Sequence, residues 1–196
     1  MKPLNVVLFH DFETLDAMGP AEVLGGIGIW TADCYSSEGG TVTSRQGIRF
    51  DTRPFREMDD SGVLLIPGGF GVRALVTAED YVARIAGFSC RAEFVLTVCT
   101  GSALLAATGH LDGREATTNK IAFDWVVSVR PEVRWQRCAR WAVDGRFYTS
   151  SGVTAGIDMA LAFLADRRGR DAALERAHRI EHVWSQKRED DPFAGP

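Results

Sequence analysis

The sequence predicts an α/β protein built on an open, mostly parallel sheet, with helices on both faces and a small antiparallel excursion. Short apolar, β-branched runs alternate with longer helical patterns along the chain, which is typical of parallel βαβ units. No repeat, low-complexity tract or Gly/Ser-rich linker interrupts this alternation. The chain has 196 residues, which is the length of about one domain. We therefore expect residues 1–196 to form a single domain.

In the first half of the chain, residues 4–9 form a mainly apolar run that is typical of a buried strand. Gly19-Pro20 is expected to open a helix, because proline is tolerated in the first helical turn. Gly25-Gly26 is expected to end that helix. Further strands are expected at residues 29–36 and 63–66, and residues 41–43 and 48–52 flank a glycine-containing turn that predicts the antiparallel excursion.

In the second half, a helix over residues 78–88 is followed by a central strand over residues 94–98. An apolar helix over residues 102–108 is expected to end at Gly109, because glycine readily takes the left-handed conformation. Asp144-Gly145 predicts a hairpin between strands at residues 137–143 and 147–150. The remaining helices are expected over residues 121–129, 153–165 and 171–186.

The composition excludes several classes of partner. The formal net charge is -4, so the chain lacks the basic excess of a non-specific nucleic-acid binder. The apolar runs are far shorter than the ~20 residues that span a bilayer. The apolar run after Lys2 is also too short for a signal peptide. We therefore expect a cytoplasmic protein that acts on a small molecule, without a nucleic-acid or membrane partner.

One of the four cysteines occupies a special position. Cys99 lies where the strand over residues 94–98 runs directly into a helix, which is the geometry of a nucleophile elbow. Unpaired helix N–H groups favour the thiolate, so we expect a lowered pKa and a nucleophilic sulfur. Cys34, Cys90 and Cys138 lie in or beside apolar segments and are expected to be small, buried, reduced packing residues.

Residues that follow the other strands are expected to meet Cys99, because ligand sites in open α/β sheets gather at the carboxyl ends of the strands. Gly68 and Gly69 follow one strand, and their N–H groups, with that of Thr100, would make an oxyanion hole. The alternative is that these glycines only form a turn. Asp16 is either the acid or base of the site or an N-cap of the first helix.

The histidines do not predict a metal site. His178 and His182 are spaced i, i+4, but no H-E-x-x-H pattern and no third ligand accompany them, so we expect a solvated helix face. His10 ends the first strand and either faces the site or is a solvated loop residue. Residues 187–191 have charges of both signs and are expected to be solvated.

Five motifs, taken together and in their order, resemble the ThiJ/PfpI (DJ-one) superfamily, which has a class I glutamine amidotransferase-like fold. The motifs are Leu15-Asp16-Ala17-Met18-Gly19-Pro20, Ile66-Pro67-Gly68-Gly69, Val98-Cys99-Thr100-Gly101-Ser102, Ala116-Thr117-Thr118-Asn119 and Gly152-Val153-Thr154-Ala155-Gly156-Ile157-Asp158. The resemblance covers nearly the whole chain. The sequence is most similar to the isocyanide hydratase branch and its unassigned bacterial relatives, in which Asp stands where other members carry Glu before Gly-Pro.

The resemblance implies a flavodoxin-like fold, a homodimer, and a cysteine-dependent hydratase or hydrolase that needs no metal or organic cofactor. It implies that the Cys99 thiolate attacks the terminal carbon of an isocyanide, that Asp16 assists protonation to a thioimidate, and that water releases an N-substituted formamide. It further implies binding roles, including stabilisation of developing negative charge, for Gly68, Gly69, Thr100 and Val153.

Departures from the family pattern leave two other functions open. Thr100 stands where protease-like members carry His, and Asn119-Lys120 stand where the hydratase commonly has His-Trp. Because the sequence ends at Pro196, we expect no helix-turn-helix domain. One alternative is a redox-sensing or protective protein with an oxidisable Cys99. The other is a cofactor-free glyoxalase, although such relatives generally carry Glu in place of Asp16 and a His near the cysteine.

Overall fold

The strands of the main sheet overlap the expected segments, although the first strand ends at Val7 rather than at residue 9 and the strand expected from residue 137 begins at Trp141. In this computed structural model, which describes residues 1–195, they are β1 (Lys2–Val7), β2 (Trp30–Ser36), β3 (Gly40–Thr43), β4 (Arg49–Pro54), β5 (Val63–Ile66), β6 (Phe94–Val98), β9 (Trp141–Asp144) and β10 (Phe147–Ser150). A separate parallel pair, β7 (Glu115–Ala116) and β8 (Arg134–Trp135), is not predicted by the sequence. The last residue of the expected domain, Pro196, lies outside the described residues.

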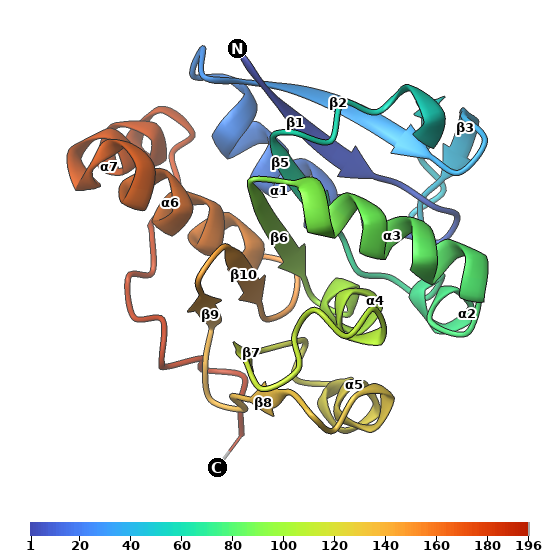
Figure 1. The fold of residues 1–196 in the computed structure, drawn as a ribbon. Coiled ribbons are helices and arrows are strands. Elements are labelled where there is room, and N and C mark those ends of the chain that lie inside the picture. Colours follow the sequence, from blue (N-terminus) through green and yellow to red (C-terminus); the bar gives the residue numbers. More distant parts are fainter. Residues whose placement is uncertain (196) are drawn as a thin grey trace.

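Within residues 1–195, the main sheet has eight strands in the order β3-β4-β2-β1-β5-β6-β10-β9 (Figure 1). The strands from β4 to β10 in this order run parallel, whereas β3 and β9 pair antiparallel with their neighbours at the two edges. The predicted open, mostly parallel sheet with an antiparallel excursion is therefore confirmed.

Helices cover both faces of the sheet, as predicted (Figure 1). The central strand β5 is buried along its whole length, because a parallel sheet with helices on both sides exposes neither face to water. One face carries α1 (Thr14–Gly25), α6 (Ala155–Arg168) and α7 (Arg170–Arg179), and the other carries α2 (Val72–Leu75), α3 (Glu79–Arg91), α4 (Gly101–Ala107) and α5 (Phe123–Val129). A short 3-10 helix, η1 (Phe55–Glu57), follows β4.

Two helices differ from the prediction at one end. Helix α1 begins at Thr14 rather than at Gly19, so Pro20 lies inside it. Proline removes an internal hydrogen bond. Helix α1 packs closely on α6 beside Pro20, since a Cβ on Gly19 would lie 2.8 Å from Ile157. Helix α7 ends at Arg179, so its predicted extension to residue 186 is wrong.

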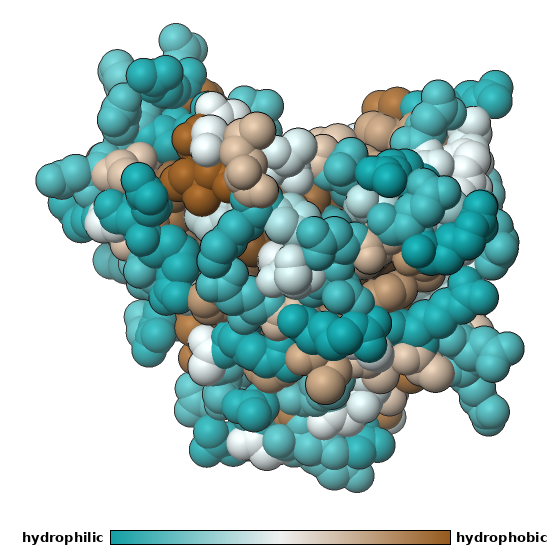
Figure 2. Space-filling model, turned by 45° about the horizontal axis from the view of Figure 1, so that its top comes forward, coloured by the Kyte–Doolittle hydropathy of each residue, from teal (hydrophilic) through white to brown (hydrophobic). Residues whose placement is uncertain are grey.

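The surface is largely hydrophilic on the face shown in Figure 2, where hydrophobic residues form small separate patches.

Cys90 and Cys138 are exposed, so the prediction that they are buried packing residues is wrong for both, while Cys34 is half-buried. Across residues 1–195, no helix combines the length and the apolar composition that crossing a membrane requires.

Candidate active site

Cys99 forms the sharp turn between β6 and α4. Its backbone φ is +56°, in a left-handed region that costs a non-glycine residue free energy and is often found at functional sites. The Cys99 N–H donates to the carbonyls of Ser150 and Ser151 at 3.1 and 3.2 Å. Its carbonyl accepts from the hydroxyls of Thr118 and Ser102 at 2.9 and 3.0 Å. The sharp turn is thus held from both sides by hydrogen bonds.

Asp16 lies next to Cys99, in the first turn of α1. Its side chain is buried, and Oδ2 accepts a hydrogen bond from the Gly68 N–H at 3.0 Å. The Cys99 thiol and the Val153 N–H also lie against the carboxylate. The capping alternative is wrong, because the N-cap position is Glu13 and the Asp16 carboxylate is directed to Gly68.

Burial changes the acidity of both groups. Desolvation raises the pKa of Asp16 to about 7, a cause that outweighs the hydrogen bond from Gly68. Desolvation and, next, the neighbouring Asp16 carboxylate raise the pKa of the Cys99 thiol, whereas donation from the Thr100 amide and hydroxyl lowers it. The lowered thiol pKa expected from the helix terminus is therefore not found. Near neutral pH the thiol holds its proton while Asp16 titrates.

Gly68 and Gly69 bring the loop after β5 against this pair. A Cβ on Gly68 would lie 2.7 Å from the Thr100 backbone nitrogen and 2.9 Å from Asp16 Oδ2. Gly69 has φ +132°, and a Cβ there would lie 2.3 Å from the carbonyl of Asp11. The close approach requires glycine at both positions. The Gly69 N–H donates to Thr100 Oγ1 at 3.0 Å, and the Thr100 hydroxyl, which lies against the Cys99 thiol, donates to the Gly69 carbonyl at 3.4 Å.

The structure thus brings together Cys99, Asp16, Gly68, Gly69, Thr100 and Val153, the six site residues that the sequence predicts. Val153 has φ +41°, so its β-branched side chain stands on a strained backbone. His10 is exposed and accepts a hydrogen bond from the Thr43 N–H. Within residues 1–195, no histidine hydrogen-bonds to Cys99 or Asp16.

A cavity of about 350 Å³ lies beside the cysteine turn. Its lining residues are Asn119, Lys120, Ile121, Ser151, Gly152 and Phe193. Ser151 joins it to the turn, because the Ser151 carbonyl accepts the Cys99 N–H. Ser151 is buried, whereas Ile121 and Phe193 are exposed. The cavity therefore has a polar floor that contacts the backbone of the Cys99 turn and an apolar rim.

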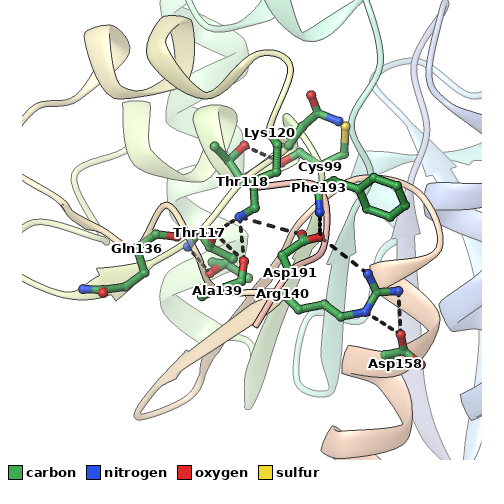
Figure 3. Close-up of polar contacts among 12 residues, drawn as sticks. Cys99, Thr117, Thr118, Lys120, Gln136, Ala139, Arg140, Asp158, Asp191 and Phe193 are labelled. Carbon is green, nitrogen blue, oxygen red and sulfur yellow. Dashed lines mark hydrogen bonds and ion pairs between the residues drawn. The ribbon is translucent and has the colours of Figure 1, made fainter. Parts of the chain in front are cut away.

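The segment after α7 contributes residues that the sequence analysis misses. Asp191, expected to be solvated, is buried near Lys120 and Arg140 (Figure 3). His182, expected on a solvated helix face, lies beyond α7 and contacts Asp158 Oδ1 through Nε2 at 2.8 Å. A charged run gives no local signal of burial. The one indication is Phe193, an aromatic residue two positions after a run of charges.

Metal ligation is not indicated by the described part of the chain. Residues 1–195 contain no group of three or more His, Cys, Asp or Glu side chains placed to hold a metal ion.

The fold and this site define a class of α/β protein in which a cysteine on a strand-to-helix turn faces a buried carboxylate. Residues 2–166 match the DJ-1/PfpI family, and the chain belongs to this family. The resemblance to the ThiJ/PfpI superfamily is therefore confirmed. The isonitrile hydratase of Pseudomonas putida is 32% identical over 171 residues, which are 87% of this chain and 74% of that protein.

Other relatives show how widely the family varies. The crystal structure of a ThiJ/PfpI family protein from Pseudomonas syringae has a TM-score of 0.84 and 26% identity, and the match covers 98% of this chain and 77% of that one. The HTH-type transcriptional regulator GbdR of Pseudomonas aeruginosa is 25% identical over 192 residues, which are 93% of this chain and 50% of the regulator. The chain thus spans half the length of that regulator.

Proposed function

We propose that this protein is a cysteine-dependent hydratase that converts an isocyanide into an N-substituted formamide. The observation that carries the proposal is the buried Cys99–Asp16 pair, in which the pKa of Asp16 is about 7. A general base is most effective when its pKa lies near the working pH. The similarity to isonitrile hydratase supports the choice of reaction.

In the first step, ionised Asp16 takes the proton of the Cys99 thiol as the sulfur attacks the terminal carbon of the isocyanide. The sulfur–carbon bond forms, one electron pair of the C≡N bond moves onto the nitrogen, and the carbon keeps its own lone pair. Asp16 then delivers the proton to that carbon, which gives a thioimidate bound to Cys99. Asp16 returns to its ionised form, so the step consumes no other acid or base.

In the second step, a water molecule adds to the thioimidate carbon. One water proton goes to the substrate nitrogen, and the oxygen stays on the carbon. The carbon–sulfur bond then breaks, and Asp16 carries the hydroxyl proton to the departing sulfur. The products are the N-substituted formamide and the Cys99 thiol, so the net change is the addition of one water.

The neighbouring residues have positioning and stabilising roles in this proposal. The Gly68 and Val153 N–H groups orient the Asp16 carboxylate. The Thr100 amide and hydroxyl stabilise negative charge on sulfur as the proton leaves. Gly69 acts through Thr100, because its N–H is already donated to Thr100 Oγ1. In the absence of substrate, its amide is not free to act as an oxyanion donor.

The two alternatives fit this site less well. Reversible oxidation favours exposed cysteines of low pKa, whereas Cys99 is buried and its pKa is raised. The glyoxalase alternative expects Glu and a nearby His, and the site has Asp16 with no histidine bonded to it in residues 1–195. We also propose a homodimer, as the resemblance implies, which light scattering coupled to gel filtration would test.

The test is an assay of purified protein with alkyl and aryl isocyanides, with formamide formation followed by mass spectrometry. Wild type is expected to turn over, and Cys99→Ala is expected to be inactive. A thioimidate adduct on the Cys99 peptide is expected after acid quenching. Turnover by Cys99→Ala would refute the nucleophile. Inactivity of wild type combined with a peroxide-dependent mass increase on Cys99 would favour the redox alternative.

A further inference from the structure

The C-terminal tail, defined here as residues 188–193, runs along the start of the edge strand β9. The carbonyl of Arg188 accepts the N–H groups of Arg140 and Trp141 at 2.7 and 3.3 Å. The N–H of Asp191 donates to the carbonyl of Cys138 at 2.8 Å. An edge strand leaves backbone groups unpaired, and the tail pairs some of them. Its path is therefore fixed by the sheet.

The side chain of Asp191 anchors the tail inside the protein. It is fully buried, and its oxygens lie 3.9 Å from Lys120 Nζ and 3.8 Å from the Arg140 guanidinium (Figure 3). Arg140 is itself paired with buried Asp158 at 2.7 Å. A buried carboxylate is costly without such partners. Asp191 Oδ1 also accepts the Phe193 N–H at 3.0 Å, which sets the direction in which the chain leaves the anchor.

The residues that receive the tail also hold the nucleophile. Lys120 Nζ donates to Thr117 Oγ1 at 2.9 Å and to the Ala139 carbonyl at 2.6 Å. Thr118, two residues before Lys120, donates to the Cys99 carbonyl at 2.9 Å. The segment from Thr117 to Lys120 thus connects the anchor of the tail to the turn that carries Cys99 (Figure 3).

This arrangement places Phe193 on the cavity beside Cys99. Phe193 is 72% exposed and Ile121 is 99% exposed, although both line the cavity. Large apolar side chains in this position gain free energy when an apolar group covers them. The ammonium group of Lys120 does not serve as a cation for the substrate, because it is directed inward to Thr117 and Ala139. The cavity therefore suits a neutral molecule with an apolar substituent.

We propose that the C-terminal tail determines substrate selectivity, with Phe193 and Ile121 forming the wall that receives the organic substituent of the substrate. Asp191 is a positioning residue that holds Phe193 in place. The preferred substrates are neutral molecules with a cycloalkyl or aryl substituent rather than a methyl group. Naming them isocyanides depends on the proposed function, but the apolar wall does not.

The first experiment measures kcat/KM for cyclohexyl isocyanide and for methyl isocyanide. The ratio of the two values is expected to fall about tenfold in Phe193→Ala, since losing a small part of a hydrophobic pocket costs 10-fold or more. Asp191→Asn is expected to lower the ratio in the same direction, and Phe193→Tyr to keep it. Val183→Ala is the matched control, because Val183 is an exposed apolar residue after α7 that does not line the cavity.

The second experiment probes the wall without any turnover. Cys99 is alkylated with iodoacetamide or with its N-phenyl derivative, and both rates are measured on the Cys99 peptide by mass spectrometry. The exposed Cys90 in the same digest corrects for the reactivity of each reagent. Wild type is expected to favour the phenyl reagent at Cys99 severalfold over Cys90. Phe193→Ala and Asp191→Asn are expected to lose this preference. Tryptic cleavage after Lys187 and Arg188 is expected to be faster than in wild type in Asp191→Asn but not in Phe193→Ala.

The outcomes separate the two proposals. An unchanged phenyl preference in Phe193→Ala and Asp191→Asn would overturn the role of the tail, whether or not isocyanides are substrates. A preference lost in both variants would support the wall even if wild type turned over no isocyanide, in which case only the proposed function would be wrong. A fall in kcat/KM that is equal for both isocyanides would also overturn the assignment.

Discussion

The substitution Asp16→Asn tests how the fold sets the acidity of the site. Burial raises the pKa of Asp16 from an ordinary value of 3.8 to about 7. Between these values the unfolded chain has released the proton and the native protein still holds it, so the native state loses stability as the pH rises. Each pH unit in this window corresponds to about 1.4 kcal/mol, which gives a total of about 4 kcal/mol. Above pH 7 the loss is complete and stability no longer depends on this group.

The assay is urea unfolding of wild type and Asp16→Asn between pH 4.5 and pH 8. Asparagine has the same shape and does not ionise. As the pH rises across this range, the free energy of unfolding of the variant is therefore expected to increase by about 3 kcal/mol relative to that of wild type. Cys99→Ala is the control: it should retain the pH dependence, because desolvation is the main cause of the Asp16 shift. If the free energies of unfolding of wild type and Asp16→Asn differed by a constant amount from pH 4.5 to pH 8, the raised pKa of Asp16 would be refuted.

Three further predictions concern activity and packing. kcat/KM should rise about tenfold per pH unit below pH 7 and level off above it, because Asp16 must be ionised to accept the thiol proton; Asp16→Asn should lack this rise and lose roughly 10²–10⁴ in kcat. Gly68→Ala should lower the free energy of unfolding, measured in urea, by about 1–3 kcal/mol, because its Cβ would meet backbone and carboxylate atoms. The same variant should also lose turnover. Arg140→Leu should lower the free energy of unfolding by about 3–5 kcal/mol, because it leaves buried Asp158 without its arginine partner. The exposed control Arg137→Leu should change the free energy of unfolding by less than about 0.5 kcal/mol.

The strands of the main sheet could largely be predicted from the sequence because their signals are local. The four buried residues of β5 form a continuous apolar run, and Asp144-Gly145 marks the hairpin between β9 and β10. The position of Cys99 follows in the same way, since β6 runs directly into the turn before α4. The predicted start of α1 is wrong, because proline favours the first helical turn whereas Pro20 lies inside the helix.

The sequence by itself determined the α/β fold class, the position of Cys99 at the strand-to-helix turn and the glycines that let the loop after β5 approach it. Only the tertiary structure decided the protonation of the site and the burial of Asp191. The physical reason is that a strand depends on residues adjacent in the chain, whereas the pKa of a group depends on everything that packs around it. Asp16, Gly68 and Cys99 come from three separate segments, and their combined desolvation has no signature in any one of them.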